Sequence, residues 1–163
     1  MIPLSPFKID IEKSQKTNEN YSYICNHLYI GNIDSLEDAN KFDIIINCTK
    51  HIAFPNIPNK IYIRIPINDD PYENANLLHF IKELNVLKTI HEGRLYGKNI
   101  LVHCHAGMQR SCAVVALYFM KYFGLKPERA IHAIRTKRII AFYPEPTFKK
   151  ALYTYYQQEN KTV

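Results

Sequence analysis

The segment from Asn99 to Gly124 constrains the fold more than any other part of the chain. Asn99–His103 is an apolar run that predicts a buried strand, and Ser111–Phe123 is a mostly apolar stretch that predicts a helix closed by Gly124. Only a short loop separates the two. Because a strand that passes directly into a helix is the building unit of α/β proteins, the sequence predicts an α/β fold.

The rest of the chain repeats this alternation. The predicted strands are Leu28–Ile30, Asp43–Asn47 and Ile61–Ile65, and the predicted helices are Ser35–Lys41, Asn74–His91, Pro127–Arg138 and Pro146–Gln158. Pro66–Glu73 is rich in Pro, Asp and Asn and is predicted to be a loop. Strands that alternate with helices indicate a mostly parallel central sheet flanked by helices.

Length and polarity divide the chain into an arm and one domain. The 163 residues suffice for about one domain, which we place at residues 21–160. Residues 1–20 are predicted to be an extended arm, because early prolines oppose a helix and apolar residues alternate with polar ones. Such an arm can add to a sheet edge, and we leave open a homodimer that forms through it.

Composition narrows the partners and the compartment. The excess of Lys and Arg gives a net charge of +6, which suits anionic partners without selecting one. The four cysteines lack CxxC spacing, which argues against zinc and against a disulfide scaffold. No apolar run reaches the ~20 residues of a membrane span, and the N-terminus does not read as a secretory signal. We predict an intracellular protein of a reducing compartment, the cytoplasm first, with nucleus and virion left open.

The loop between the strand and the helix carries the residues with chemistry. A helix N-terminus after a strand offers unpaired N–H groups and a positive dipole end, and is therefore an anion site. Gly107 allows close approach of the backbone, and the planar guanidinium of Arg110 matches two phosphate oxygens. The same N–H groups favour the thiolate form of Cys104. A nucleophile and a phosphate clamp thus share one loop, as phosphoryl transfer through a thiophosphate intermediate requires.

These residues, in the order His103-Cys104, five residues, then Arg110-Ser111, resemble the H-C-x5-R-S signature of cysteine-dependent protein tyrosine phosphatases. Further segments resemble small dual-specificity phosphatases, the last of them the poxvirus-type members: Ile24–Gly31, Phe42–Thr49, Arg64–Asp69 and Ala141–Lys150. The resemblance covers about residues 22–155 and implies the fold of that family.

The resemblance also implies roles. Cys104 is the nucleophile, and Arg110 binds the phosphate and the transition state. Asp69 protonates the leaving oxygen and then activates water, while Ser111 donates a hydrogen bond to the departing sulfur and His103 orients the loop. The implied phosphate-binding residues are His105, Ala106, Gly107, Met108, Gln109 and Arg110. No cofactor and no metal is implied.

Two positions and one basic run invite separate expectations. Gln109 stands where small residues are common in the family, and we expect it to narrow the pocket or to reposition the hydrolytic water. Glu145 stands where the family has Asn, which removes one expected support of the loop. The basic run at residues 135–138 is predicted to be a solvated helix end, with steering of a phosphorylated substrate as the alternative.

The function that follows is a protein phosphatase that hydrolyses phosphotyrosine and phosphoserine/threonine through a phosphocysteine. Two alternatives keep the same loop: a phosphatase of RNA 5′ ends or of phosphoinositides, and a pseudophosphatase that only binds phosphosites. Nucleic acid is open but not favoured. The resemblance further implies that Cys48, at the end of a predicted strand, can reach Cys104 and form a disulfide on oxidation. A packing role alone for Cys48 is the alternative.

Overall fold

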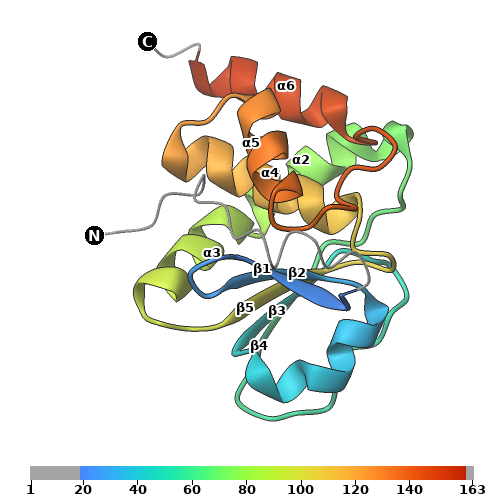
Figure 1. Ribbon diagram of the computed structural model, residues 1–163, viewed down its shortest axis with the longest axis vertical. Coiled ribbons are helices and arrows are strands. Elements are labelled where there is room, and N and C mark those ends of the chain that lie inside the picture. The colour runs from blue at the N-terminus through green and yellow to red at the C-terminus, as the bar shows by residue number, and fades with distance from the viewer. Residues whose placement is uncertain (1–18, 161–163) are drawn as a thin grey trace.

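One five-stranded sheet lies at the centre of the computed structural model, which describes residues 19–160 (Figure 1). Its order is β1-β2-β5-β3-β4, and every neighbouring pair is parallel except β1 with β2. The strands are β1 (Tyr21–Cys25), β2 (Leu28–Gly31), β3 (Ile44–Asn47), β4 (Ile61–Arg64) and β5 (Ile100–His103). The prediction of a mostly parallel central sheet is confirmed. Most of the predicted arm lies outside the described residues.

The first two strands form a hairpin that the sequence did not reveal. Only Leu28–Ile30 is predicted as a strand in this segment, and the structure adds β1 before a turn at which His27 has a φ of +69°. A non-glycine residue in that region marks a tight turn, so the chain reverses and β1 pairs with β2. The sheet thereby gains one antiparallel edge strand.

The alternation of side chains along the strands gives the sheet two buried faces. Ile44 and Ile46 of β3 face the larger core together with Ile100 and Val102 of β5. Ile45 and Leu101 face the opposite way, into a smaller core. Because both faces are covered, the strands are apolar along their whole length, as parallel strands in α/β proteins are.

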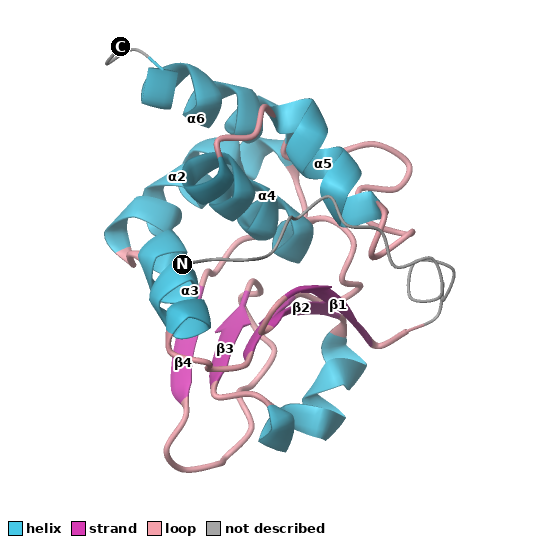
Figure 2. Cartoon of the chain, turned by 60° about the vertical axis from the view of Figure 1, so that its left-hand side comes forward, coloured by secondary structure: helices cyan, strands magenta, loops and turns pink. Residues whose placement is uncertain are grey.

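Helices cover the two faces unequally (Figure 2). The face with the larger core carries α2 (Asn74–Glu83), α3 (Val86–Leu95), α4 (Arg110–Phe123), α5 (Pro127–Arg135) and α6 (Lys149–Asn160). The other face carries the 3₁₀ helix η1 (Ile33–Lys41), and η2 (Pro71–Glu73) is a single 3₁₀ turn. Helix α4 lies at the centre of the larger layer, where it packs against α3, α5, α6 and β5. Its residues 111–120 are all buried, which explains the absence of a polar face in that stretch.

Four predicted helices need correction. The single helix Asn74–His91 is two helices, because Asn85 adopts the left-handed conformation (φ +52°) and breaks the chain direction. The expected helix at Ser35 is a 3₁₀ helix that begins at Ile33 and is capped by Asn32. Helix α5 ends at Arg135 rather than Arg138, and α6 begins at Lys149 rather than Pro146.

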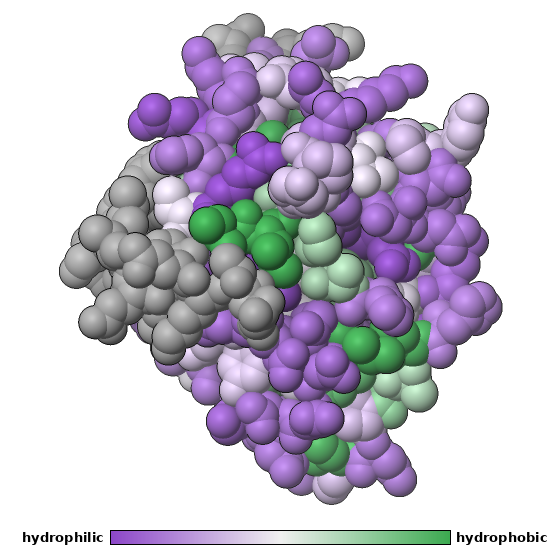
Figure 3. Space-filling view, turned by 45° about the vertical axis from the view of Figure 1, so that its right-hand side comes forward, coloured by the Kyte–Doolittle hydropathy of each residue, from purple (hydrophilic) through white to green (hydrophobic). Residues whose placement is uncertain are grey.

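The surface turned to the viewer in Figure 3 is mostly hydrophilic, with small and separate hydrophobic patches. The large apolar side chains that are exposed come from segments spread along the chain, among them Ile33, Leu95 and Ile139. Within residues 19–160, no helix combines the length and the hydrophobicity needed to cross a membrane.

Candidate active site

The loop between β5 and α4 is held by hydrogen bonds to its carbonyl groups. The backbone N–H of Ile33 donates to His105 O at 2.9 Å, and that of Phe142 donates to Met108 O at 2.7 Å. The Nε of Arg138 donates to Gly107 O at 2.8 Å. With these three carbonyl oxygens bound from outside, the loop can turn N–H groups toward an anion, and the N–H of Gly107 points at the Cys104 sulfur. This is the arrangement of an anion-binding nest at a helix N-terminus.

The sulfur of Cys104 sits inside this loop. It accepts a hydrogen bond from the backbone N–H of Gly107 at 3.2 Å, and the Ser111 hydroxyl lies 3.2 Å away. At that distance the hydroxyl can act as donor or acceptor toward the sulfur. Cys104 itself is almost fully buried, so only a group that enters the loop reaches the sulfur.

Gly107 cannot be replaced without distorting this loop. Its φ of +67° lies in the left-handed region, and an added Cβ would stand 2.6 Å from Arg138 Nη2 and 2.7 Å from the carbonyl oxygen of Gly31. Both distances are shorter than any normal contact. The glycine therefore serves close approach of the backbone as well as the turn itself.

Arg110 lies across the loop from the sulfur with part of its guanidinium unused. Its Nη1 donates to the carbonyl of Ile67 at 3.1 Å, which ties the start of α4 to the segment after β4. Its Nε is buried and has no hydrogen-bond partner among residues 19–160. A buried donor of this kind is costly unless an acceptor arrives, and a phosphate oxygen is such an acceptor.

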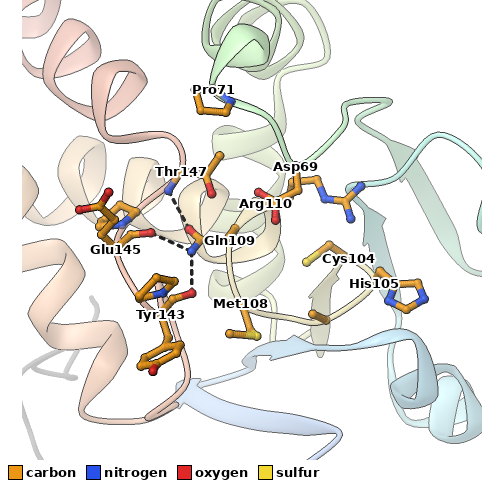
Figure 4. Close-up of a pocket in the computed structure, with 13 residues that line it drawn as sticks. Asp69, Pro71, Cys104, His105, Met108, Gln109, Arg110, Tyr143, Glu145 and Thr147 are labelled. Carbon is orange, nitrogen blue, oxygen red and sulfur yellow. Dashed lines mark hydrogen bonds between the residues drawn. The ribbon is translucent and has the colours of Figure 1, made fainter.

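The two adjacent carboxylates of the loop after β4 have different surroundings. Asp69 is exposed and lines the same cleft as Cys104 and Arg110 (Figure 4). Asp70 instead accepts a hydrogen bond from the backbone N–H of Tyr72 at 2.9 Å and caps η2. The loop that carries them is held by Glu73, which accepts from the backbone N–H of Asn68 at 2.6 Å. Only Asp69 is therefore placed to exchange a proton with a group in the cleft.

The cleft has a volume of about 600 Å³ and combines charged and apolar walls. One side is formed by Asp69 and Pro71, and the other by the segment 143–147 (Figure 4). The remaining lining residues come from the loop itself: Cys104, His105, Ala106, Met108, Gln109 and Arg110. The structure thus brings the predicted residues Asp69, Cys104 and Arg110 into one cavity, with Ser111 behind the sulfur.

His103 lies behind the loop and is fully buried. Its Nδ1 is 3.4 Å from the carbonyl oxygen of Cys104, and its Nε2 has no partner among the described residues. Burial lowers the pKa of His103 to about 4, which makes the ring neutral at pH 7. A neutral ring keeps an N–H for the Cys104 carbonyl without adding a charge beneath the loop.

The basic run at residues 135–138 does not form a solvated helix end, and that prediction is wrong. Lys137 and Arg138 are buried, and the Nη1 of Arg138 donates to Ser22 Oγ at 2.9 Å and to the carbonyl oxygen of Glu19 at 3.1 Å. Together with its bond to Gly107, Arg138 links the underside of the loop to β1. The sequence pattern missed this residue because its partners are more than 30 positions away in the chain.

We expect Arg138→Met to lower the free energy of unfolding by about 2–5 kcal/mol, because it leaves buried acceptors without a donor. Chemical denaturation measures this loss, and Lys150→Met on the exposed face of α6 is the matched surface control. Arg138→Lys should lie between the two, since one ammonium nitrogen cannot take the positions of both Nε and Nη1. Equal stability of Arg138→Met and Lys150→Met would contradict the role given to this guanidinium.

The donor set of the cleft does not suit a metal ion. Residues 19–160 contain no group of three or more His, Cys, Asp and Glu side chains arranged to hold one. Arg110 at the start of α4 also lines this cleft, and a guanidinium at a helix N-terminus binds anions.

A family model for the dual specificity phosphatase catalytic domain matches residues 23–158 of the chain. The chain is 35% identical over 144 residues to dual specificity protein phosphatase 22 of Mus musculus, and the match spans 85% of the chain and 74% of that protein. It is 37% identical over 130 residues to dual specificity protein phosphatase 15 of Homo sapiens, across 77% of the chain and 42% of that protein.

Solved structures agree with these sequence matches. The crystal structure of DUSP15 superposes with a TM-score of 0.65 at 29% identity, over 88% of this chain and 92% of that one. The crystal structure of human DUSP28 gives a TM-score of 0.74 at 23% identity, over 86% of this chain and 95% of that one. The second likeness concerns the fold alone.

Proposed function

The chain belongs to the dual specificity phosphatase family, and from that membership we propose that it hydrolyses phosphotyrosine and phosphoserine/threonine in proteins through a phosphocysteine. One observation carries the proposal: Cys104, whose sulfur accepts from Gly107 N–H, lines one cleft together with Asp69 and with Arg110, whose Nε has no hydrogen-bond partner among residues 19–160. A nucleophile, an oxyanion clamp and a proton donor are the three parts that phosphoryl transfer requires.

In the first step the Cys104 thiolate attacks phosphorus. An S–P bond forms while the P–O bond to the substrate breaks, and Asp69 gives its proton to the leaving oxygen. The N–H groups of the loop and the Arg110 guanidinium bind the three remaining phosphate oxygens. Their arrangement before substrate arrives means that little reorganisation accompanies the transfer of charge.

In the second step water attacks the phosphocysteine. Asp69, now a carboxylate, takes a proton from that water, and the S–P bond breaks to give inorganic phosphate and the Cys104 thiolate. The Ser111 hydroxyl, 3.2 Å from the sulfur, supports this departure by donating to the developing negative charge. The first step thus leaves Asp69 as the carboxylate that the second step needs, and the second step restores the protonated Asp69 and the Cys104 thiolate.

The composition of the loop favours phosphoproteins over phosphoinositides. Lipid-directed loops tend to carry lysines between the Cys and the Arg, whereas residues 105–109 are His-Ala-Gly-Met-Gln. The position of Asp69 favours a phosphate monoester, whose leaving oxygen needs a proton. A pseudophosphatase is disfavoured because both Cys104 and Arg110 are present and share the cleft.

A substrate panel tests the proposal. We expect the wild-type protein to release phosphate from matched phosphotyrosine and phosphothreonine peptides, with little release from a phosphoinositide or from a 5′-triphosphorylated RNA. Release of phosphate from RNA or lipid alone would replace the proposed substrate class. Tight binding of the phosphopeptides with no turnover at all would make the protein a phosphosite reader.

We also expect reversible inactivation by hydrogen peroxide. Asn47 pairs with His103 in the parallel register of β3 and β5, so Cys48 and Cys104 follow at neighbouring positions. Peroxide oxidises the Cys104 thiolate to a sulfenic acid, and attack by the Cys48 sulfur gives a disulfide and water. Burial raises the pKa of the Cys48 thiol well above its usual range, so we expect this second step to be slow.

Peptide mapping after peroxide treatment, with recovery of activity by dithiothreitol, measures this disulfide. Cys112 is the rival partner, but its sulfur lies 3.6 Å from the carbonyl of Gly107 within the buried first turn of α4. Cys112→Ser is therefore the matched control. A Cys48→Ser variant that recovers as completely as the wild type would show that Cys48 only packs the core.

A further inference from the structure

The side chain of Gln109 forms hydrogen bonds with the segment 143–147, which lines one side of the cleft. Its Nε2 donates to the carbonyl of Tyr143 at 3.1 Å and to that of Glu145 at 2.9 Å, and its Oε1 accepts from the backbone N–H of Thr147 at 2.9 Å (Figure 4). Both amide hydrogens are used. The amide therefore has no hydrogen left to donate to a water, and the expectation that Gln109 narrows the pocket or repositions the hydrolytic water stays a prediction.

The three hydrogen bonds hold the first, middle and last residues of this segment, which are Tyr143, Glu145 and Thr147. The wall is residues 143–147, and it faces Asp69 and Pro71 across the cleft (Figure 4). The chain just before the wall is fixed by Arg135, which donates to the carbonyl groups of Ala141 and Phe142. Gln109 extends that fixation into the part of the segment that lines the cleft.

The wall presents apolar side chains to the cleft on either side of the exposed Glu145. Tyr143 is 67% exposed, and it is followed by two prolines that also line the cavity. Pro71 stands on the opposite side. A flat aromatic ring buries apolar area against such surfaces, whereas the short side chain of phosphoserine reaches them less. The width between the two sides therefore bears on the choice between aryl and alkyl phosphates.

We propose that Gln109 is a positioning residue that fixes the wall 143–147 opposite Pro71 and so sets the preference of the cleft for aryl over alkyl phosphates. The proposal rests on the proposed function. A positioning role differs from a purely structural role in its effect on activity. Loss of a positioning residue changes the ratio of activities on aryl and alkyl phosphates, whereas loss of a structural residue lowers both activities equally. Gln109 is only 7% exposed, which restricts its direct contact with a substrate.

The test compares kcat/KM for a phosphotyrosine peptide with that for a phosphothreonine peptide of the same sequence. In Gln109→Met the side chain keeps its length but loses all three hydrogen bonds, and we expect the aryl-to-alkyl ratio to fall about fivefold or more. Because the ratio is taken relative to wild type, the different chemistry of the two leaving groups cancels. The control is Gln158→Met on the exposed end of α6, for which we expect the wild-type ratio.

A second variant adds a pH signature. In Gln109→Glu the ionised carboxylate faces two carbonyl oxygens, so the selectivity loss should be largest at neutral pH. Once protonated, the carboxyl can donate to one of these oxygens, and we expect the ratio to return toward that of wild type as the pH falls toward 5. Gln109→Met should show no such return.

The outcomes separate the two proposals. Unchanged ratios in both variants, or equal losses on both peptides, would overturn the positioning role while leaving the phosphatase intact. Absence of turnover by the wild-type protein on both peptides would overturn the proposed function itself. Unfolding curves of each variant exclude a loss that comes only from misfolding.

Discussion

Cys104→Ser should lower kcat on a phosphotyrosine peptide by roughly 10³-fold or more, because removal of a nucleophile removes the covalent step. The serine hydroxyl is not ionised at neutral pH. The loop N–H groups and the Arg110 guanidinium remain in place, so binding of the phosphopeptide should persist. Steady-state kinetics measures the first effect, and isothermal titration measures the second.

The matched control is Cys25→Ser, in a buried cysteine of β1 that does not line the cleft. It should cost stability without removing turnover. A Cys104→Ser protein that keeps more than about a tenth of the wild-type rate would exclude the thiolate mechanism.

Asp69→Asn should lower kcat/KM by ~10²–10⁴-fold on substrates whose leaving oxygen needs a proton. The basic limb of the pH–rate profile should flatten, because that limb reports the loss of the acid's proton. The neighbouring Asp70→Asn is the matched control. Asparagine can still accept the hydrogen bond from Tyr72 N–H, so that variant should keep both its rate and its cap.

The expected contrast follows from where the two carboxylates lie, one in the cleft and one at the start of η2. A pH–rate profile that flattens in Asp70→Asn and not in Asp69→Asn would move the general acid by one residue. Equal losses in both variants would indicate damage to the loop rather than loss of a proton donor.

Much of the fold was predictable because its signals are local. The apolar run of β5 and the long apolar stretch of α4 each reflect the burial of one element on all sides. The features that the sequence analysis missed are also local, but their signal in the sequence is weak. The break at Asn85 needs one residue in the left-handed conformation, and nothing in the helical pattern from Asn74 onward marks it. The turn at His27 is a similar case.

The residues of the site were likewise predictable where the signal is local and were missed where their partners lie far away in the chain. Cys104 and Arg110 were found because they lie six positions apart, one in the loop and one at the start of α4, so that spacing alone indicates their proximity. Gln109 and Arg138 act on segments distant in sequence, and their contacts depend on how α5 and the chain beyond it pack. Residue type misled at Arg138, since a positive charge at a helix end is more often solvated than buried. Only the three-dimensional arrangement shows that its guanidinium has three acceptors.

The strand order has a consequence for biosynthesis. β5 is the last strand to leave the ribosome, yet it lies in the middle of the sheet, between β2 and β3. Until residue 103 has emerged, the native order allows only the pairs β1–β2 and β3–β4, and the inner edges of β2 and β3 have no native partner. Long-range parallel pairing of this kind forms slowly. The unfinished chain is therefore most exposed to aggregation just before it makes the segment that will carry the nucleophile.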